Sequence, residues 1–480
     1  MLALQTQDSL AGQAEQLAAG EVSSVELVER ALARAEELQP LLGAFRVILA
    51  EQARAEAVRA DERLAAGERA PLLGVPFAIK DDVDLEGQST AFGCAGDFPS
   101  KTADCELVRR LRAAGAVIVG KTNTPEVGLY PFTEGLAFGV TRNPWNLNHT
   151  PGGSSGGAAA AVAAGIVAAT IGSDGAGSIR VPAAWTGLVG VKPQRGRIST
   201  WPEAEAFNGL SGLGPLTHTV ADAALLLDLL SGPHPEDLHR PPPPNEPFAK
   251  AAATDPGTLR IALSLRAPFS GVPVALDPEI CAAIVRLAGV LGDLGHHVIE
   301  ADPRYGLMGL TLMVRGQAGV HEWISNVPDP ALLDPRTREA ARVGRLFAGP
   351  LLSLARRAEP WLRRRVGSVF EDVDVVLTPT TASPPLRVGV TAGLSGWKTD
   401  RIMASACPYA WPWNVLGWPG MSVPAGLSAT GLPIGAQLLG RANDEATLLA
   451  LAAQLEGVER WAQQRPSALA LHVRGRCVAP

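Results

Sequence analysis

The sequence predicts an α/β fold in which helices cover a central β-sheet. Three patterns carry the prediction. A short apolar run at residues 75–79 precedes a polar turn, an amphipathic helix pattern at 106–114 leads directly into an apolar run at 117–121, and strand, helix and strand patterns follow one another across 259–299. Helix then strand, repeated along a chain, is typical of a sheet enclosed by helices. The 46% hydrophobic content of the 480 residues is enough to fill a large core.

The first part of the chain is predicted to begin with helices. Residues 15–65 are predicted as mostly helical, because residues 22–27 resemble a capped helix start and apolar residues then recur at three- and four-residue steps. The apolar run at 75–79 predicts a strand with Lys80 at its end. The Ala- and Gly-rich run at 156–172 is shorter than the ~20 residues that a membrane span needs, so we interpret it as a buried helix.

The second half continues the alternation beyond a proline-rich connector at 240–245. Further helices are predicted at 220–230, 279–294 and 445–455, with a mostly helical, basic stretch at about 305–370, and strands at 259–263, 297–299, 373–377, 421–424 and 434–439. Because the alternation resumes after the connector, we interpret it as an insertion in one large domain. We therefore expect a helical arm at 1–68, a main domain at 69–460 with an insertion near 233–257, and a tail at 461–480.

Charge and cysteine content narrow the class of protein. The net charge of −6 and the pI of about 5.8 do not favour nucleic acid or an anionic membrane as a partner. The five cysteines are odd in number and include no CxxC pair, so neither a disulfide framework nor a zinc site is expected. Residues 1–20 lack a basic start followed by an apolar block, so no signal peptide is expected. A cytoplasmic protein with free thiols, no metal and no cofactor is the expectation.

Three segments carry candidate chemistry: Lys80 at the end of its strand, GGSSGG at 152–157, and DGAGSIR at 174–180. A lysine becomes a base when burial lowers its pKa, and a serine hydroxyl can both donate and accept a proton between that lysine and a second serine. Glycines beside the serines let backbone N–H groups approach a carbonyl oxygen closely. The order of these residues predicts a Ser–Ser–Lys site for acyl transfer, which cleaves amides without histidine.

Other interpretations of the same segments are weaker. Taken alone, GGSSGG is typical of a flexible loop, and Lys80 alone would be a surface lysine. The segment also fits G-x-S-x-G at Ser154 and at Ser155, but that site needs a downstream acid and then a histidine. His321 has no recognisable setting, and His472 lies in the expected C-terminal tail. A P-loop is excluded because no Gly-Lys-Ser/Thr follows the glycines.

Several long motifs in order resemble the amidase signature family of serine hydrolases. Residues 151–157 (PGGSSGG) and 172–183 (GSDGAGSIRVPA) are similar to its defining stretch, and Ser154 and Ser178 are 24 positions apart, as in the family (178 − 154). Further matches are GKTN at 120–123, TRNPW at 141–145, GVKP at 190–193 and GPL at 214–216. The resemblance spans residues 74–440 and implies a single large mixed β-sheet with helices on both faces.

The resemblance implies a role for each residue of the site. Ser178 would be the nucleophile, Ser154 the bridging serine within an unusual cis peptide, and Lys80 the base. The oxyanion hole would be formed by backbone N–H groups of Gly175, Ala176, Gly177 and Ser178. Many members of the family have glycine where this chain has Ala176. Because alanine keeps the backbone donor, we take this departure to bear on the substrate and not on activity.

Other side chains near these motifs have less specific signals. Aromatic residues in segments that border the site in similar proteins include Tyr130, Phe132 and Trp413, which are candidates for the substrate pocket, although plain core is the more frequent role of such residues. Asp174 and Arg180 flank the nucleophile; either they pair to order its strand or they form a surface ion pair worth ~0–1 kcal/mol.

The implied function is that of a stand-alone amidase, which turns a carboxamide into a carboxylate and ammonia or an amine. Its partner would be a small amide, and a homodimer is compatible with the resemblance. The alternative within the family is the glutaminase (A) subunit of a tRNA-dependent amidotransferase. Residues 406–413 (ACPYAWPW) are uncharged where an acidic contact for glutamine would be expected, and Val181 stands where those subunits commonly have glutamine. Both observations favour the stand-alone enzyme.

Overall fold

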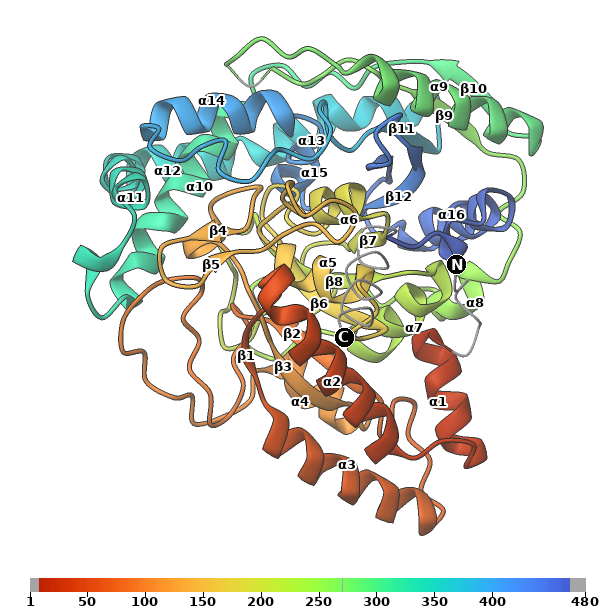
Figure 1. Cartoon of the computed structure of the whole chain (residues 1–480). Helices are drawn as coiled ribbons and strands as arrows, with labels where there is room; N and C mark the ends of the chain where they lie inside the picture. The colour runs from red at the N-terminus through yellow and green to blue at the C-terminus, as the bar shows by residue number, and fades with distance from the viewer. Residues whose placement is uncertain (1–7, 270, 467–480) are drawn as a thin grey trace.

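A computed structural model describes residues 8–269 and 271–466 of the chain (Figure 1). Within these residues eleven strands form one sheet in the order β1-β3-β2-β6-β8-β7-β12-β13-β11-β9-β10, and β4 pairs with β5 in a separate two-stranded sheet. The large sheet is mixed, since β2 runs parallel to β3 and β6, whereas β6 runs antiparallel to β8. The predicted α/β fold with one large mixed sheet is confirmed.

The strands are short and the helices are distributed along the whole chain. The strands are β1 (Phe45–Ile48), β2 (Pro76–Lys80), β3 (Val117–Thr122), β4 (Glu134–Gly135), β5 (Gly139–Val140), β6 (Ala169–Asp174), β7 (Val189–Lys192), β8 (Gly212–Thr217), β9 (Arg260–Leu263), β10 (His297–Glu300), β11 (Val375–Pro379), β12 (Gly420–Leu427) and β13 (Pro433–Leu439). The helices are α1 (Leu10–Ala19), α2 (Ser24–Leu42), α3 (Ala50–Ala65), α4 (Glu106–Ala113), α5 (Gly156–Ala163), α6 (Arg180–Thr186), α7 (Val220–Leu230), α8 (Phe248–Ala252), α9 (Pro278–Asp293), α10 (Gly309–Trp323), α11 (Pro335–Phe347), α12 (Pro350–Arg357), α13 (Glu359–Gly367), α14 (Gly396–Ala406), α15 (Pro412–Leu416) and α16 (Glu445–Glu459). Short 3-10 turns are η2 (Glu126–Gly128), η3 (Ile324–Asn326), η4 (Pro330–Leu332), η5 (Ser368–Glu371) and η6 (Trp461–Gln463).

The two halves of the chain share the sheet. Strand β7 pairs antiparallel with β12, with Gly420 opposite Lys192. Strand β12 in turn pairs with β13 along its length. The proline-rich connector therefore lies between two parts of one continuous sheet and does not divide it.

Alternate residues of the strands enter two hydrophobic cores, one on each face. In β2, Ile79 lies in a cluster that α1, α4, α7, α9 and α16 cover, whereas Ala78 lies in a second cluster with α2, α3 and α5. This follows from the two-residue period of a strand, whose successive side chains point to opposite faces. A third cluster, around Trp413, packs α13 and α15 beside the sheet.

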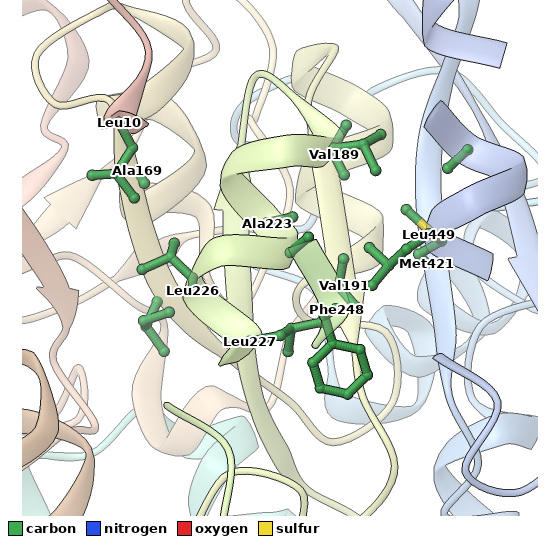
Figure 2. Close-up of a cluster of buried hydrophobic side chains, with 14 of the residues drawn as sticks. Leu10, Ala169, Val189, Val191, Ala223, Leu226, Leu227, Phe248, Met421 and Leu449 are labelled. Carbon is green, nitrogen blue, oxygen red and sulfur yellow. The ribbon is translucent and has the colours of Figure 1, made fainter. Parts of the chain in front are cut away.

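The first core joins segments that are far apart in the sequence (Figure 2). Helix α7 directs Leu226 and Leu227 toward the sheet, where Val191 of β7 and Met421 of β12 lie. Each fully buried leucine contributes ~1.5–3 kcal/mol relative to an exposed one. Figure 1 shows α1 to α3 at one end of the molecule and α10, α11, α12 and α14 at the opposite end.

Two expectations from the sequence need correction, and a third concerns residues that the structure does not describe. The run at 156–172 is not one buried helix: α5 ends at Ala163 and β6 begins at Ala169. The predicted helical arm also contains β1, which pairs with β3 and forms the edge of the sheet. Residues 467–480 of the expected tail, with His472, lie outside the described residues. No helix among the described residues is both long and apolar enough to span a bilayer.

Candidate active site

The sheet brings the three candidate segments together at one edge. Strands β2 and β6 are parallel neighbours, with Ala78 opposite Thr170 and Ile79 opposite Ile171. Their carboxyl ends therefore lie side by side, and they deliver Lys80 and the turn at 175–179 to the same region. The third segment precedes α5, whose glycine start lets it pack closely: a Cβ on Gly157 would lie 2.4 Å from the carbonyl oxygen of Ala44.

Lys80 is fully buried and sits at the centre of a polar cluster. Its Nζ lies 2.7 Å from Ser154 Oγ, 2.7 Å from Ser173 Oγ and 3.2 Å from Asp82 Oδ2. The Ser173 hydroxyl also donates to Asp82 Oδ2. Burial lowers the pKa of the Lys80 amine below its ordinary value, while the Asp82 carboxylate acts in the opposite direction.

Ser154 is held in a tightly packed loop. The Gly153–Ser154 peptide is cis, and a Cβ on Gly153 would lie 2.4 Å from the carbonyl oxygen of Tyr130, so only glycine fits there. Ser154 Oγ accepts a hydrogen bond from Lys80, and its own proton is donated to no other described residue. The hydroxyl therefore has a donor left for a third group.

Ser178 lies in the turn between β6 and α6. Its side chain is half-buried, and its hydroxyl makes no hydrogen bond to another described residue. The turn is attached to the Ser154 loop because the N–H of Ser155 donates to the carbonyl oxygen of Ser178 at 3.1 Å. Gly177 has a φ of +120°, and a Cβ there would lie 2.7 Å from Cβ of Ala410. The turn thus needs glycine for both its conformation and its space.

The predicted pairing of Asp174 and Arg180 is present and fully buried. Arg180 Nε donates to Asp174 Oδ2 at 3.0 Å, and a second guanidinium nitrogen donates to Oδ1 at 3.0 Å. Burial alone would raise the pKa of the Asp174 carboxyl, but the Arg180 guanidinium outweighs burial and holds that pKa well below its usual range. The surface interpretation of this pair is therefore wrong.

Two residues far along the chain complete this ion pair, and the sequence did not indicate either. Asn414 donates to Asp174 Oδ1 at 2.8 Å and accepts from Arg180 at 2.6 Å. Gln437 accepts from Arg180 at 2.7 Å. Asp82 and Ser173 were also missed as contacts of Lys80, although Asp82 lies two positions after Lys80 and Ser173 lies within the motif at 172–183. For Asn414 and Gln437 no local signal exists, because their contacts depend on the sheet order.

The four backbone N–H groups proposed for the oxyanion hole differ in their partners. The N–H of Gly177 donates to Asp174 Oδ1 at 2.7 Å. The N–H groups of Gly175, Ala176 and Ser178 make no hydrogen bond to another described residue. Ala176 is exposed, and Gly175 is half-buried. Three donors therefore remain available beside the hydroxyl of Ser178.

The three aromatic pocket candidates lie in two different places. The rings of Tyr130 and Phe132 stack at 4.9 Å between centroids, and their backbone packs on Gly153 beside Ser154. Trp413 is fully buried in the third hydrophobic cluster; its ring lies 6.5 Å from that of Trp418, and its indole N–H donates to the carbonyl oxygen of Gly440. Of the three candidates, only Tyr130 and Phe132 are seen to pack on the loop that carries Ser154.

No group of three or more His, Cys, Asp or Glu side chains within the described ranges is arranged to hold a metal ion. The cysteines that the structure describes, Cys94, Cys105, Cys281 and Cys407, are free thiols, and Cys477 lies outside these residues. The polar groups at the site are a lysine, hydroxyls, a carboxylate and backbone N–H groups. Such a set can transfer protons and bind an oxyanion, which is what acyl transfer requires.

Comparisons with known proteins show which family the chain resembles along its length. The sequence model of the family described as Amidase matches residues 26–449. A Mycobacterium tuberculosis protein named "Putative amidase AmiA2" is 55% identical over 452 residues, which cover 94% of this chain and 93% of that protein. A glutamyl-tRNA(Gln) amidotransferase subunit from a Synechococcus species is 37% identical over 487 residues, covering 95% and 97%.

Solved structures give the same result for the fold. The structure of 6-aminohexanoate cyclic dimer hydrolase complexed with substrate has a TM-score of 0.88 and 32% identity, covering 96% of this chain and 99% of that one. A bacterial aryl acylamidase of the amidase signature family has a TM-score of 0.85 and 27% identity, covering 95% and 97%. The similarity therefore extends over nearly the whole described chain and includes the segments of the site.

Proposed function

The chain belongs to the amidase signature family, and we propose that it is a stand-alone amidase that hydrolyses a carboxamide through an acyl-enzyme on Ser178. The observation that carries the proposal is the 2.7 Å contact between the buried amine of Lys80 and the hydroxyl of Ser154, beside the turn that holds Ser178. A buried lysine in contact with a serine hydroxyl, which can give its proton to the lysine and take one from another hydroxyl, is the arrangement that a proton relay needs.

The relay would work as follows in the acylation step. Neutral Lys80 takes the proton of Ser154, which takes the proton of Ser178 as Oγ of Ser178 bonds to the substrate carbonyl carbon. The proton then returns through Ser154 to the leaving nitrogen as the carbon–nitrogen bond breaks. A water molecule repeats the same proton transfers and releases the carboxylate. The lysine ends each cycle in the neutral form in which it began.

The developing oxyanion would be bound by the N–H groups of Gly175, Ala176 and Ser178. This assignment is supported by their lack of other partners among the described residues. Gly177 was the fourth candidate, but its N–H is already used by Asp174, so we assign it to the shape of the turn. The role of the buried Asp174–Arg180 pair is then to hold this turn rigid before the substrate arrives.

The substrate class that we propose is a small linear amide. Tyr130 and Phe132 supply apolar surface next to the Ser154 loop, and no acidic side chain lies in residues 406–413, where a charged amine of glutamine would need one. The identity to AmiA2 is greater than that to the amidotransferase protein, which supports this choice over a glutaminase role. Free thiols at four cysteines support a reducing, cytoplasmic location, and a homodimer remains compatible with the proposal.

Ammonia release from a panel of small amides tests the function. The panel contains aliphatic, aryl and short peptide amides together with free glutamine, and Ser178→Ala is the control. We expect release from at least one apolar amide and none from glutamine. Release from glutamine alone would overturn the stand-alone assignment, and release that persists in Ser178→Ala would remove Ser178 as the nucleophile.

A further inference from the structure

A cavity of about 590 Å³ lies outside the cluster of Lys80, Ser154 and Ser178. Its wall includes Arg266, Phe269, Val274, Arg304, Tyr305 and Arg365. Arg266 and Phe269 follow β9, Arg304 and Tyr305 follow β10, and Arg365 lies in α13. Because β9 and β10 are parallel neighbours, both loops leave the same edge of the sheet. The carboxyl edge of such strands is where α/β proteins place ligands.

Three arginines line this cavity, and the nearby carboxylate of Asp302, which precedes the lining residue Pro303, accepts a hydrogen bond from the Ser264 hydroxyl at 2.7 Å. Arg266, Arg304 and Arg365 are exposed, none of them forms an ion pair with another described residue, and no carboxylate is among the residues that line the cavity. Some other exposed arginines of the described chain do form such pairs, for example Arg286 with Glu459 at 2.6 Å, whereas others, such as Arg357 and Arg364, do not. Three guanidinium groups around one hollow produce a positive potential that an anion would relieve.

Arg365 is held in position over the cavity. A Cβ on Gly306 would lie 3.2 Å from Arg365 Nε, so the side chain packs on the backbone of the loop after β10. Its guanidinium carbon also lies 5.5 Å from the centre of the Trp361 ring. Stacking on an aromatic ring limits the freedom of the side chain, which lowers the entropy that binding would cost.

The remaining wall is apolar apart from one phenol. Tyr305 is 6% exposed, and its hydroxyl has no hydrogen-bond partner among the described residues. Burial raises the pKa of this hydroxyl, so it stays protonated. The side chains of the cavity thus combine hydrogen-bond donors with the apolar surfaces of Phe269 and Val274. This combination suits a ligand with an acceptor-rich anionic end and an apolar body.

We propose that this cavity is a binding site for an organic anion, whose carboxylate or phosphate contacts Arg266, Arg304 and Arg365. None of the residues that line the cavity belongs to the nucleophile turn, but residues 409–410 contact the surroundings of both. The Tyr409 hydroxyl donates to the carbonyl oxygen of Leu265 at 2.7 Å, and the carbonyl oxygen of Ala410 accepts from Arg180 at 2.9 Å.

Isothermal titration of the full chain tests the proposal with three probes: benzoate, inorganic phosphate and neutral benzyl alcohol. We expect benzoate or phosphate to bind saturably and more weakly at high salt, and benzyl alcohol not to bind. Binding of benzoate alone identifies a carboxylate ligand, and binding of phosphate identifies a phosphoryl ligand. All titrations are repeated on Ser178→Ala, so that the result does not depend on the proposed reaction.

The variant Arg304→Gln/Arg365→Gln removes two of the positive charges, and its matched control is Arg357→Gln/Arg364→Gln, two exposed arginines outside the cavity. Loss of two charge-assisted contacts should weaken anion binding at least about tenfold, whereas the control should bind as the original chain does. Absence of saturable anion binding by the original chain would overturn the proposal. Equal weakening in both double variants would also overturn the proposal, because the effect would then come from the net charge of the protein and not from these two arginines.

Discussion

The Asp82 carboxylate lies 3.2 Å from the amine of Lys80, so the proposed base faces a charge that favours its protonated form. Burial lowers the pKa of Lys80, and Asp82 raises it. The Ser173 hydroxyl accepts a hydrogen bond from Lys80 and donates one to Asp82, so it links the two groups. The balance between burial and this carboxylate decides the pH at which Lys80 becomes neutral.

Replacing Asp82 tests that balance. Asp82→Asn keeps an acceptor for Ser173 but removes the negative charge, so the pKa of Lys80 should fall further. A base acts in its neutral form, whose fraction rises with pH through the pKa. The acid limb of the kcat profile should therefore move to lower pH. Asp84→Asn is the control, since Asp84 pairs with Lys101; a limb that moves to higher pH, or moves equally in both variants, contradicts the prediction.

Loss of the Ser178 hydroxyl should remove turnover while leaving the fold intact. We expect Ser178→Ala to lower kcat by roughly a thousandfold or more, as for nucleophiles of other serine hydrolases. A serine-reactive phosphonate should add to the original chain and not to this variant, as measured by intact mass. The control is Ser211→Ala, a half-buried serine near Gly175. Labelling that persists in Ser178→Ala would assign the nucleophile to another residue.

The buried pair of Asp174 and Arg180 should be costly to break from one side. Arg180→Met leaves the Asp174 charge buried and unpaired, and we expect the free energy of unfolding in urea to fall by about 3–5 kcal/mol. Adding Asp174→Asn should recover part of that loss, because the two groups interact directly. The exposed pair of Arg54 and Glu29 is the control, where Arg54→Met should cost far less, because both charges stay in contact with water. Equal losses at the two sites would contradict this view.

Two glycines of the nucleophile turn, Gly175 and Gly177, should differ in how well they tolerate replacement by alanine. Gly177→Ala introduces a Cβ 2.7 Å from Ala410 at a φ of +120°, so it should shift the turn and lower kcat strongly. Gly175→Ala meets its first neighbour only at 3.8 Å, in Ser211, and should retain most activity. Steady-state kinetics with far-UV circular dichroism distinguishes the two. If Gly175→Ala were the more damaging, the assigned packing of the turn would be incorrect.

Local sequence patterns were sufficient to predict helices whose extent is marked by a cap or by an amphipathic period within the segment itself. The predicted helix at 220–230 coincides with α7, whose start is capped by Thr219, and the amphipathic pattern at 106–114 corresponds to α4. The run at 156–172 failed because an uninterrupted Ala- and Gly-rich stretch has no period that separates buried helix from buried strand. Strand β1 was missed because four residues between two helices give a weak signal.

The residues of the site also fall into two groups, those that local motifs identify and those that they do not. Lys80, Ser154 and Ser178 could be named from motifs because each lies beside glycines or at the end of an apolar run. Asn414 and Gln437 could not, since they reach Arg180 across 234 and 257 positions of the chain. Their role depends on which strands become neighbours in the sheet, and that arrangement is not encoded in any short segment.

Arg180 binds residues that lie much later in the chain, so these contacts can form only late in synthesis. The three proposed catalytic side chains have left the ribosome once residue 178 has emerged, but Ala410 and Gln437, which bind the Arg180 guanidinium, have not. A nascent chain of that length contains the complete set of reactive groups without the contacts that fix the turn. The enzyme therefore becomes competent late, after the last strands have emerged, and truncated products of translation should be inactive.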